Sequence, residues 1–156
     1  MKRLITACVS ASLLVAHNAA SAADFGTTVP MHEGSKSSYY IDGHLEGYGA
    51  VELMVDTGSS YLTINQETLD VLTRKGNAEY SRDLKGSLAN GNTIVVPVYK
   101  ISGLNIGATC RLTEVEAAVF PNASRLILGL NALRQTAPFI FSVDPPSLTL
   151  SNCNKT

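Results

Sequence analysis

The sequence lacks several features that mark particular classes of protein. None of its apolar runs reaches the roughly 20 residues that a membrane-spanning helix needs. Charged residues make up only 16% of the chain and form no basic cluster, which argues against nucleic acid as a partner. The chain also has no internal repeat or low-complexity tract. We therefore expect one small folded domain, with no stable membrane insertion of the mature chain.

The N-terminus has the layout of a secretory signal peptide over residues 1–22. Lys2 and Arg3 precede a mostly apolar stretch, and Ala20-Ser21-Ala22 forms a small-x-small cleavage site. An uncleaved anchor and a lipoprotein signal at Cys8 are the alternatives. Removal of 22 of the 156 residues leaves 134, and the loss of two positive charges changes the net charge from −1 to −3. We expect an exported protein, in the periplasm of a Gram-negative source and secreted otherwise.

Few cysteines are present, and only Cys110 and Cys153 would remain after that cleavage. An even pair in an exported protein favours a disulfide, so an intrachain Cys110–Cys153 bond is the first expectation. A Cys153–Cys153 bond across a dimer and two free thiols stay open. The spacing is not that of a metal site, and His32 and His44 are far from both cysteines in sequence. No metal site is predicted.

Short strands broken by turn residues predict an all-β domain over residues 39–152. Residues 23–38 are rich in Gly, Ser and Thr and lack periodicity, which predicts a flexible N-terminal arm. One or two short helices are expected, one capped by Asn65 and one over residues 130–135. The expected strands are 39–41, 49–55, 61–64, 86–88, 93–99, 110–120, 126–128, 139–143 and 147–150.

Turn signals divide these strands. Asp42-Gly43 and Asn90-Gly91 predict hairpin turns, and Asn-Gly is the strongest two-residue signal of this kind. Pro97 removes a ladder donor, so the second hairpin is expected to be exposed or at an edge. Another turn is expected at residues 105–107, and the polar residues 76–84 are expected to form a loop.

The most informative stretch is an apolar strand, residues 51–55, that runs directly into Asp56-Thr57-Gly58-Ser59. Peptide hydrolysis by water needs a base and an acid, and two close carboxylates that share one proton supply both. The chain has one such turn, so the second carboxylate would have to come from another copy of the chain. The alternative is an ordinary turn, since Asp, Gly and Ser are common turn formers.

The neighbours of the aspartate suit this chemistry. Gly58 allows a tight turn and the close approach of a facing backbone. Thr57 offers a hydroxyl that can bond across to that facing loop. Ser59 can donate a hydrogen bond to the Asp56 carboxylate, which would favour its charged form.

With these motifs, the chain resembles the retropepsin-type aspartic proteases, the single-domain class that includes retroviral proteases and similar exported bacterial proteins. The resemblance covers roughly residues 39–150. Residues 55–60 match the catalytic loop, Asn90-Gly91 with its flanking strands matches the flap, and residues 126–133, Leu-Ile-Leu-Gly-Leu-Asn-Ala-Leu, are similar to the second conserved element.

The resemblance implies a closed, barrel-like β subunit that works as a homodimeric aspartic endopeptidase on a polypeptide substrate. Asp56, Thr57, Gly58 and Ser59 of each copy would form the catalytic site, with a water between the two aspartates. Ala89, Asn90, Gly91 and Asn92 would hold the peptide from the flap through backbone bonds. No metal or organic cofactor is implied.

The sequence departs from the retroviral pattern in places. An acidic residue after the catalytic Gly and its arginine partner are replaced by Ser60, Tyr61 and Leu130, and the flap has no tryptophan. Ser59 follows the Gly where retroviral enzymes often have alanine. The missing ion pair and Ser59 both point to the cellular and bacterial branch, and Ser59 also suggests an acidic optimum. Two other functions stay open: a non-catalytic exported module that binds peptides, and a structural β-domain of an envelope assembly.

Overall fold

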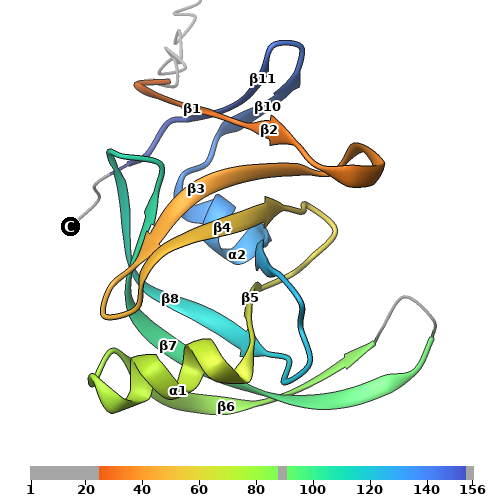
Figure 1. The fold of residues 1–156 in the computed structure, drawn as a ribbon, viewed down its shortest axis with the longest axis vertical. Coiled ribbons are helices and arrows are strands. Elements are labelled where there is room, and N and C mark those ends of the chain that lie inside the picture. The colour runs from red at the N-terminus through yellow and green to blue at the C-terminus, as the bar shows by residue number, and fades with distance from the viewer. Residues whose placement is uncertain (1–24, 88–90, 154–156) are drawn as a thin grey trace, which may run out of the picture.

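The computed structural model describes residues 25–87 and 91–153 and consists mostly of β-strands (Figure 1). The elements in chain order are β1 (Thr27–Pro30), β2 (His32–Glu33), a short 3-10 helix (Ser35–Ser37), β3 (Tyr39–Leu45), β4 (Gly49–Val55), β5 (Leu62–Ile64), α1 (Gln66–Arg74), β6 (Ala78–Ser87), β7 (Thr93–Ile106), β8 (Cys110–Val119), β9 (Leu126–Leu128), α2 (Leu130–Gln135), β10 (Phe139–Val143) and β11 (Pro146–Leu150).

Six of the strands close into a barrel. The large sheet has the order β2-β3-β4-β9-β5-β8-β7-β6, and a further pairing of β3 with β7, at Gly43↔Ile106, joins its two sides. Most neighbours are antiparallel, but β4 pairs with β9 and β5 with β8 in parallel. Closure removes the unpaired edges that open sheets expose. The predicted all-β, barrel-like fold with one or two short helices is therefore confirmed.

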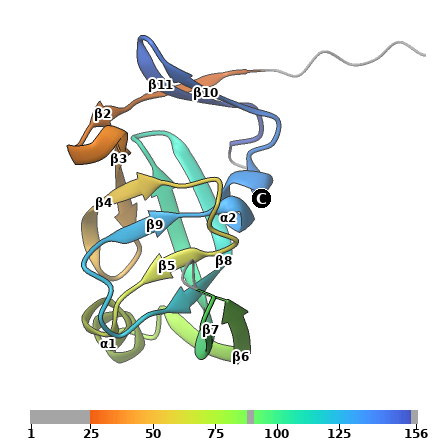
Figure 2. The same ribbon diagram turned by 90° about the vertical axis from the view of Figure 1, so that its right-hand side faces the viewer.

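A second sheet, of order β1-β11-β10, lies across one end of the barrel, at the top of Figures 1 and 2. The prediction of a flexible arm over residues 23–38 is wrong, because β1 of this sheet and β2 of the large sheet are ordered strands in that range. Val29 and Met31 are buried, with Val29 opposite Leu148 in the register. These partners are more than 100 residues away, so no local pattern could reveal them.

Two turn predictions and one loop prediction are wrong. β3 continues through Asp42-Gly43, and the chain turns at residues 46–48 instead, where Gly47 has φ +83°. A Cβ on Gly43 would lie 2.9 Å from the Asn105 carbonyl, so glycine here permits the close approach of β3 and β7. The turn after β7 lies at residues 107–109, just beyond the predicted position. Residues 78–84, expected as loop, begin β6, a polar edge strand formed by pairing with β7.

The first helix agrees with its predicted signals. The Asn65 side chain accepts a hydrogen bond from the Thr68 N–H at 2.9 Å and caps α1. Gly76, with φ +72°, follows the helix. The buried side of the helix, through Leu69 and Leu72, packs on the main core inside the barrel.

An intrachain disulfide joins Cys110, at the start of β8, to Cys153 near the C-terminus, with Cα atoms 4.7 Å apart. This confirms the first of the three predicted cysteine arrangements. Cys110 is fully buried in the main core, so the bond fastens the segment after β11 to the barrel.

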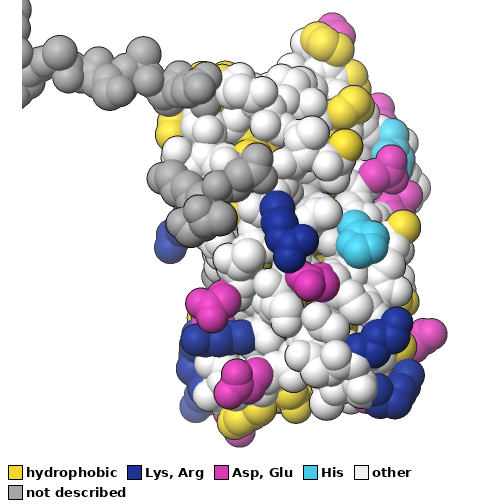
Figure 3. Space-filling model, turned by 90° about the vertical axis from the view of Figure 1, so that its left-hand side faces the viewer, with side chains coloured by type: hydrophobic (Ala, Val, Ile, Leu, Met, Phe, Trp, Pro, Cys, Tyr) yellow, Lys and Arg dark blue, Asp and Glu magenta, His cyan; other side chains and the backbone are white. Residues whose placement is uncertain are grey.

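Within the described residues no helix is long and apolar enough to cross a membrane. On the face shown in Figure 3, basic and acidic side chains are interspersed and do not gather by sign.

Candidate active site

Strand β4 leads directly into Asp56, which lies in a tight turn at one end of the barrel. The Asp56 N–H donates to the Leu128 carbonyl of β9 at 3.1 Å, which continues the parallel pairing of the two strands. Within the turn, the Gly58 N–H donates to Asp56 Oδ1 at 2.8 Å and the Ser59 N–H to the Asp56 carbonyl at 3.2 Å. The carboxylate thus accepts one backbone hydrogen bond, the main chain of Asp56 is fixed by two more, and the residue is half-buried.

The start of α2 passes directly beneath this turn. The Leu130 N–H donates to the Ser59 carbonyl at 2.8 Å and the Asn131 N–H to the Ser60 carbonyl at 3.1 Å. A Cβ on Gly129 would lie 2.2 Å from the Tyr61 carbonyl oxygen. Only glycine allows the backbones to pass this closely, since any side chain would displace the loop that carries Asp56.

Asn131 ties the loop to the barrel, a role that the sequence reasoning did not identify. Its Oδ1 accepts hydrogen bonds from the Leu62 N–H at 2.7 Å and the Ala132 N–H at 2.8 Å, while its Nδ2 donates to the Glu116 carbonyl on β8. An asparagine just after the apolar-apolar-Gly element was the available signal, because its amide can bond in both directions.

Ser59 does not act as predicted. Its hydroxyl donates to the Tyr61 carbonyl at 3.0 Å and makes no contact with the Asp56 carboxylate. The reason is the turn itself, in which the Gly58 N–H is the donor to Asp56 Oδ1. The expected effect of Ser59 on the Asp56 charge, and the acidic optimum inferred from it, therefore lose their structural basis.

The four predicted catalytic residues lie together in this one turn. Asp56 and Ser59 line a cleft, whereas Thr57 and Gly58 are exposed and do not line it. Among the residues that line the cleft, all of them within the described ranges, Asp56 is the only acidic one. The described residues also contain no cluster of His, Cys, Asp or Glu that could hold a metal ion.

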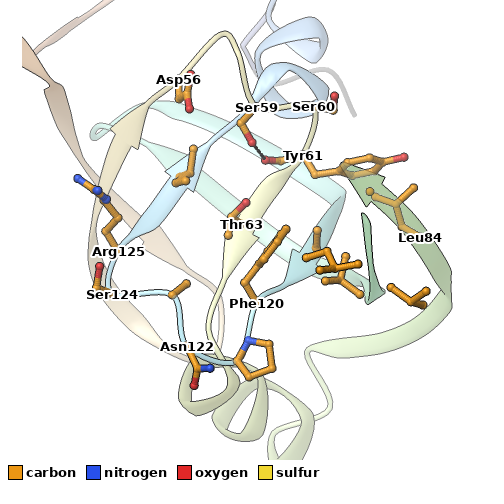
Figure 4. A pocket seen from close by; sticks show the side chains of 18 of the residues that line it. Asp56, Ser59, Ser60, Tyr61, Thr63, Leu84, Phe120, Asn122, Ser124 and Arg125 are labelled. Carbon is orange, nitrogen blue, oxygen red and sulfur yellow. Dashed lines mark hydrogen bonds between the residues drawn. The ribbon is translucent and has the colours of Figure 1, made fainter. Parts of the chain in front are cut away.

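The cleft has a volume of about 1040 Å³ and lies between the barrel and the β6–β7 hairpin (Figure 4). One side is apolar, with Val96, Val98 and Ala118 buried beneath Tyr61 and neighbouring side chains of the hairpin. The other side is formed by β9 and the segment before it. Apolar walls with a few placed polar groups are typical of binding sites.

The predicted hairpin about Asn90-Gly91 is formed by β6 and β7 and lies over the cleft, and at Pro97 strand β7 has run beyond its pairing with β8. Of the four predicted substrate-binding residues, Ala89 and Asn90 lie outside the described residues. Gly91, with φ +84°, and Asn92 stand at the tip and do not line the cleft of the single chain. The residues of the hairpin that line it, which the sequence reasoning did not select, are Leu84, Lys85, Gly86, Ile94, Val95 and Val96.

An ion pair fixes the base of this hairpin. Arg82 on β6 donates from Nη1 and Nη2 to the two carboxylate oxygens of Glu116 on β8. Its Nη2 also donates to the Tyr61 hydroxyl at 3.0 Å. The hydrogen bonds from Arg82 lower the pKa of Glu116, and the bonds to Glu116 and Tyr61 raise the pKa of Arg82. The pair couples the hairpin to the wall of the cleft.

Comparison with known proteins agrees with this architecture. Residues 41–135 match the family model described as "gag-polyprotein putative aspartyl protease". Among solved structures, a retropepsin-like aspartic protease from Rickettsia conorii is similar, with a TM-score of 0.59, 19% identity, and coverage of 80% of this chain and 91% of that chain. No curated protein sequence matches the chain. The fold is therefore retropepsin-like.

Proposed function

The chain belongs to the gag-polyprotein aspartyl protease family, and from this premise we propose that it is an aspartic endopeptidase whose site is completed by a second copy. The observation that carries the proposal is the position of Asp56, which lines the cleft with a single carboxylate, accepts a hydrogen bond from the Gly58 N–H and is anchored through its main chain. One carboxylate cannot serve as both base and acid in the same step. A two-fold pair of chains supplies the second one.

In such a pair, the two Asp56 carboxylates face each other with a water between them. Because like charges at that distance do not both ionise easily, the pair shares one proton. The unprotonated carboxylate takes a proton from the water as the water oxygen attacks the peptide carbonyl carbon. The protonated one supplies the proton that the product amine needs, so neither a metal nor an organic cofactor takes part.

The exposed residues around the site have a use in this arrangement. Thr57 is exposed in the single chain, so its hydroxyl can hydrogen-bond to the facing loop of the second copy. Ala89, Asn90, Gly91 and Asn92 would add backbone bonds to an extended peptide as the hairpin closes. The apolar wall beneath the hairpin would receive a large apolar side chain of the substrate.

The test is cleavage of a mixed peptide library by residues 23–156 from about pH 3 to pH 8, beside the isosteric Asp56→Asn variant. Loss of a general acid–base group predicts a decrease of at least about 10²-fold to 10⁴-fold in kcat/KM. Sedimentation of both proteins gives the oligomeric state. Residual cleavage by Asp56→Asn that survives repurification would refute the mechanism. If the wild type forms a well-folded dimer and cleaves no peptide, the result would favour a module that binds peptides without cutting them.

We also propose that the protein acts after export, with residues 1–22 removed. The Cys110–Cys153 disulfide supports this, since such bonds persist in oxidising compartments. Mass spectrometry of the protein recovered from the source cells should give a chain that starts at Ala23. An intact N-terminus on a protein found in the cytosol would contradict the proposal.

A further inference from the structure

The cleft carries one basic side chain that the proposed function leaves without a role. Arg125 is exposed, lines the cleft and directly precedes β9. It stands two positions before Ile127 of β9, another residue that lines the cleft. In Figure 4 it lies on the side of the pocket opposite Leu84.

Arg125 is held in place by a neutral partner. Its Nη1 donates to the Tyr40 hydroxyl at 3.3 Å, and the Tyr40 ring stacks on His32 with centroids 5.8 Å apart. The register of β4 with β9 places Glu52 next to Arg125, but the Glu52 carboxylate pairs with His32 Nε2 at 3.0 Å. None of the ion pairs between described residues involves Arg125.

The other charged groups of the cleft do not duplicate this one. Asp56 belongs to the catalytic turn. Lys85 alternates along β6 with Leu84, whose side chain packs inward on the apolar cluster, and it pairs in register with Val95, which is 64% exposed. Lys85 lines the cleft from the hairpin, on the side of the pocket that carries Leu84 and that lies opposite Arg125. Arg125 is the basic side chain of the wall formed by β9 and the segment before it, the wall that leads to Asp56 through the pairing of β9 with β4.

We propose that Arg125 selects substrates with an acidic side chain close to the scissile bond, a specificity that rests on the proposed peptidase function. A guanidinium has five N–H donors in a planar fork, of which the contact with Tyr40 uses one. The fork matches a carboxylate with two parallel hydrogen bonds. In a two-fold pair, one Arg125 would stand on each side of the two aspartates, so an acidic residue on either side of the cleaved bond is accepted.

The test uses matched peptides with amidated C-termini that differ only in Glu, Gln or Lys at each position around one cleaved bond. At about pH 6, above the ordinary Glu pKa of about 4.3, the Glu side chain is ionised. Wild type should prefer Glu to Gln by about tenfold in kcat/KM at one or more positions, as expected of an exposed charge-assisted pair. Arg125→Gln should abolish this preference, and Arg125→Glu should turn it toward Lys.

Arg74→Gln and Arg74→Glu are the matched controls, since Arg74 is exposed at the end of α1 and does not line the cleft. They should keep the wild-type preference. Equal cleavage of Glu and Gln peptides by the wild type, or an unchanged preference in Arg125→Glu, would overturn the specificity while leaving the peptidase intact. Failure of the wild type to cut any peptide would instead refute the proposed function. A preference that appears only with free C-termini would show that the terminal carboxylate is the group recognised.

Discussion

Asn131 and Leu62 are 69 positions apart in sequence, yet the Asn131 side-chain oxygen accepts a hydrogen bond from the Leu62 N–H at 2.7 Å. This bond connects the first turn of α2 to the strand that follows the Asp56 turn. The same amide reaches Glu116 on β8, so one side chain joins three elements around Asp56. The position of the carboxylate therefore depends on a residue that does not line the cleft.

We first predict that Asn131→Ala lowers stability by about 2–3 kcal/mol, because buried backbone groups lose their partners. Asn131→Asp keeps the acceptor for the Leu62 and Ala132 N–H groups but loses the donor to Glu116. Its stability should therefore lie between those of Asn131→Ala and the wild type. Urea unfolding measures both. Cleavage should fall in the same order, and equal stability of all three proteins would contradict the role of this amide.

The second prediction concerns Gly129. Gly129→Ala would place its Cβ 2.2 Å from the Tyr61 carbonyl oxygen. The Cβ is fixed by the backbone of residue 129 and the oxygen belongs to the backbone of Tyr61, so neither atom can rotate away. We expect a loss of at least about 3 kcal/mol, at the upper end for overpacking. Gly86→Ala is the control for stability, since its Cβ would meet nothing within 4 Å, and a change below about 1 kcal/mol is expected there. Similar unfolding midpoints for the two variants would show that the crossing is not tight.

The third prediction is a pH dependence of the Arg82–Glu116 pair. Because its hydrogen bonds with Arg82 lower the pKa of Glu116 in the folded protein, the pair stabilises the fold above the unfolded pKa of Glu. This contribution is lost as the pH falls through the folded pKa. Glu116→Gln should therefore be less stable than wild type at neutral pH, and the difference should vanish in acid. Urea midpoints at a series of pH values check this, and a difference that grows toward low pH would contradict it.

The parts of this fold that the sequence reveals are those with local signals. A few neighbouring residues are enough to specify the strand before Asp56, the Asn65 cap and the apolar run of β9. The flexible arm was predicted wrongly because β1 is held by β11 at the other end of the chain.

The same limit applies to the site. The turn of Asp56 is local and was predicted, but the Ser59 hydroxyl bonds to the Tyr61 carbonyl and not to the Asp56 carboxylate. Gly43 resembled a turn residue because close strand crossing and tight turning both require a missing side chain. Arg125 had no sequence signal, since its place in the cleft follows from pairing of β4 with β9.

The fourth prediction concerns the Cys110–Cys153 disulfide, which closes a loop with a sequence separation of 43. The entropy lost by the unfolded chain on closing a loop of this length corresponds to roughly 4 kcal/mol. Thermal unfolding with and without a reductant should show a clearly lower Tm for the reduced wild type. Cys110→Ala/Cys153→Ala should unfold near the reduced protein, with a small further loss because Cys110 is fully buried. A reduced wild type as stable as the oxidised one would mean that β10 and β11 hold the C-terminal segment without the bond.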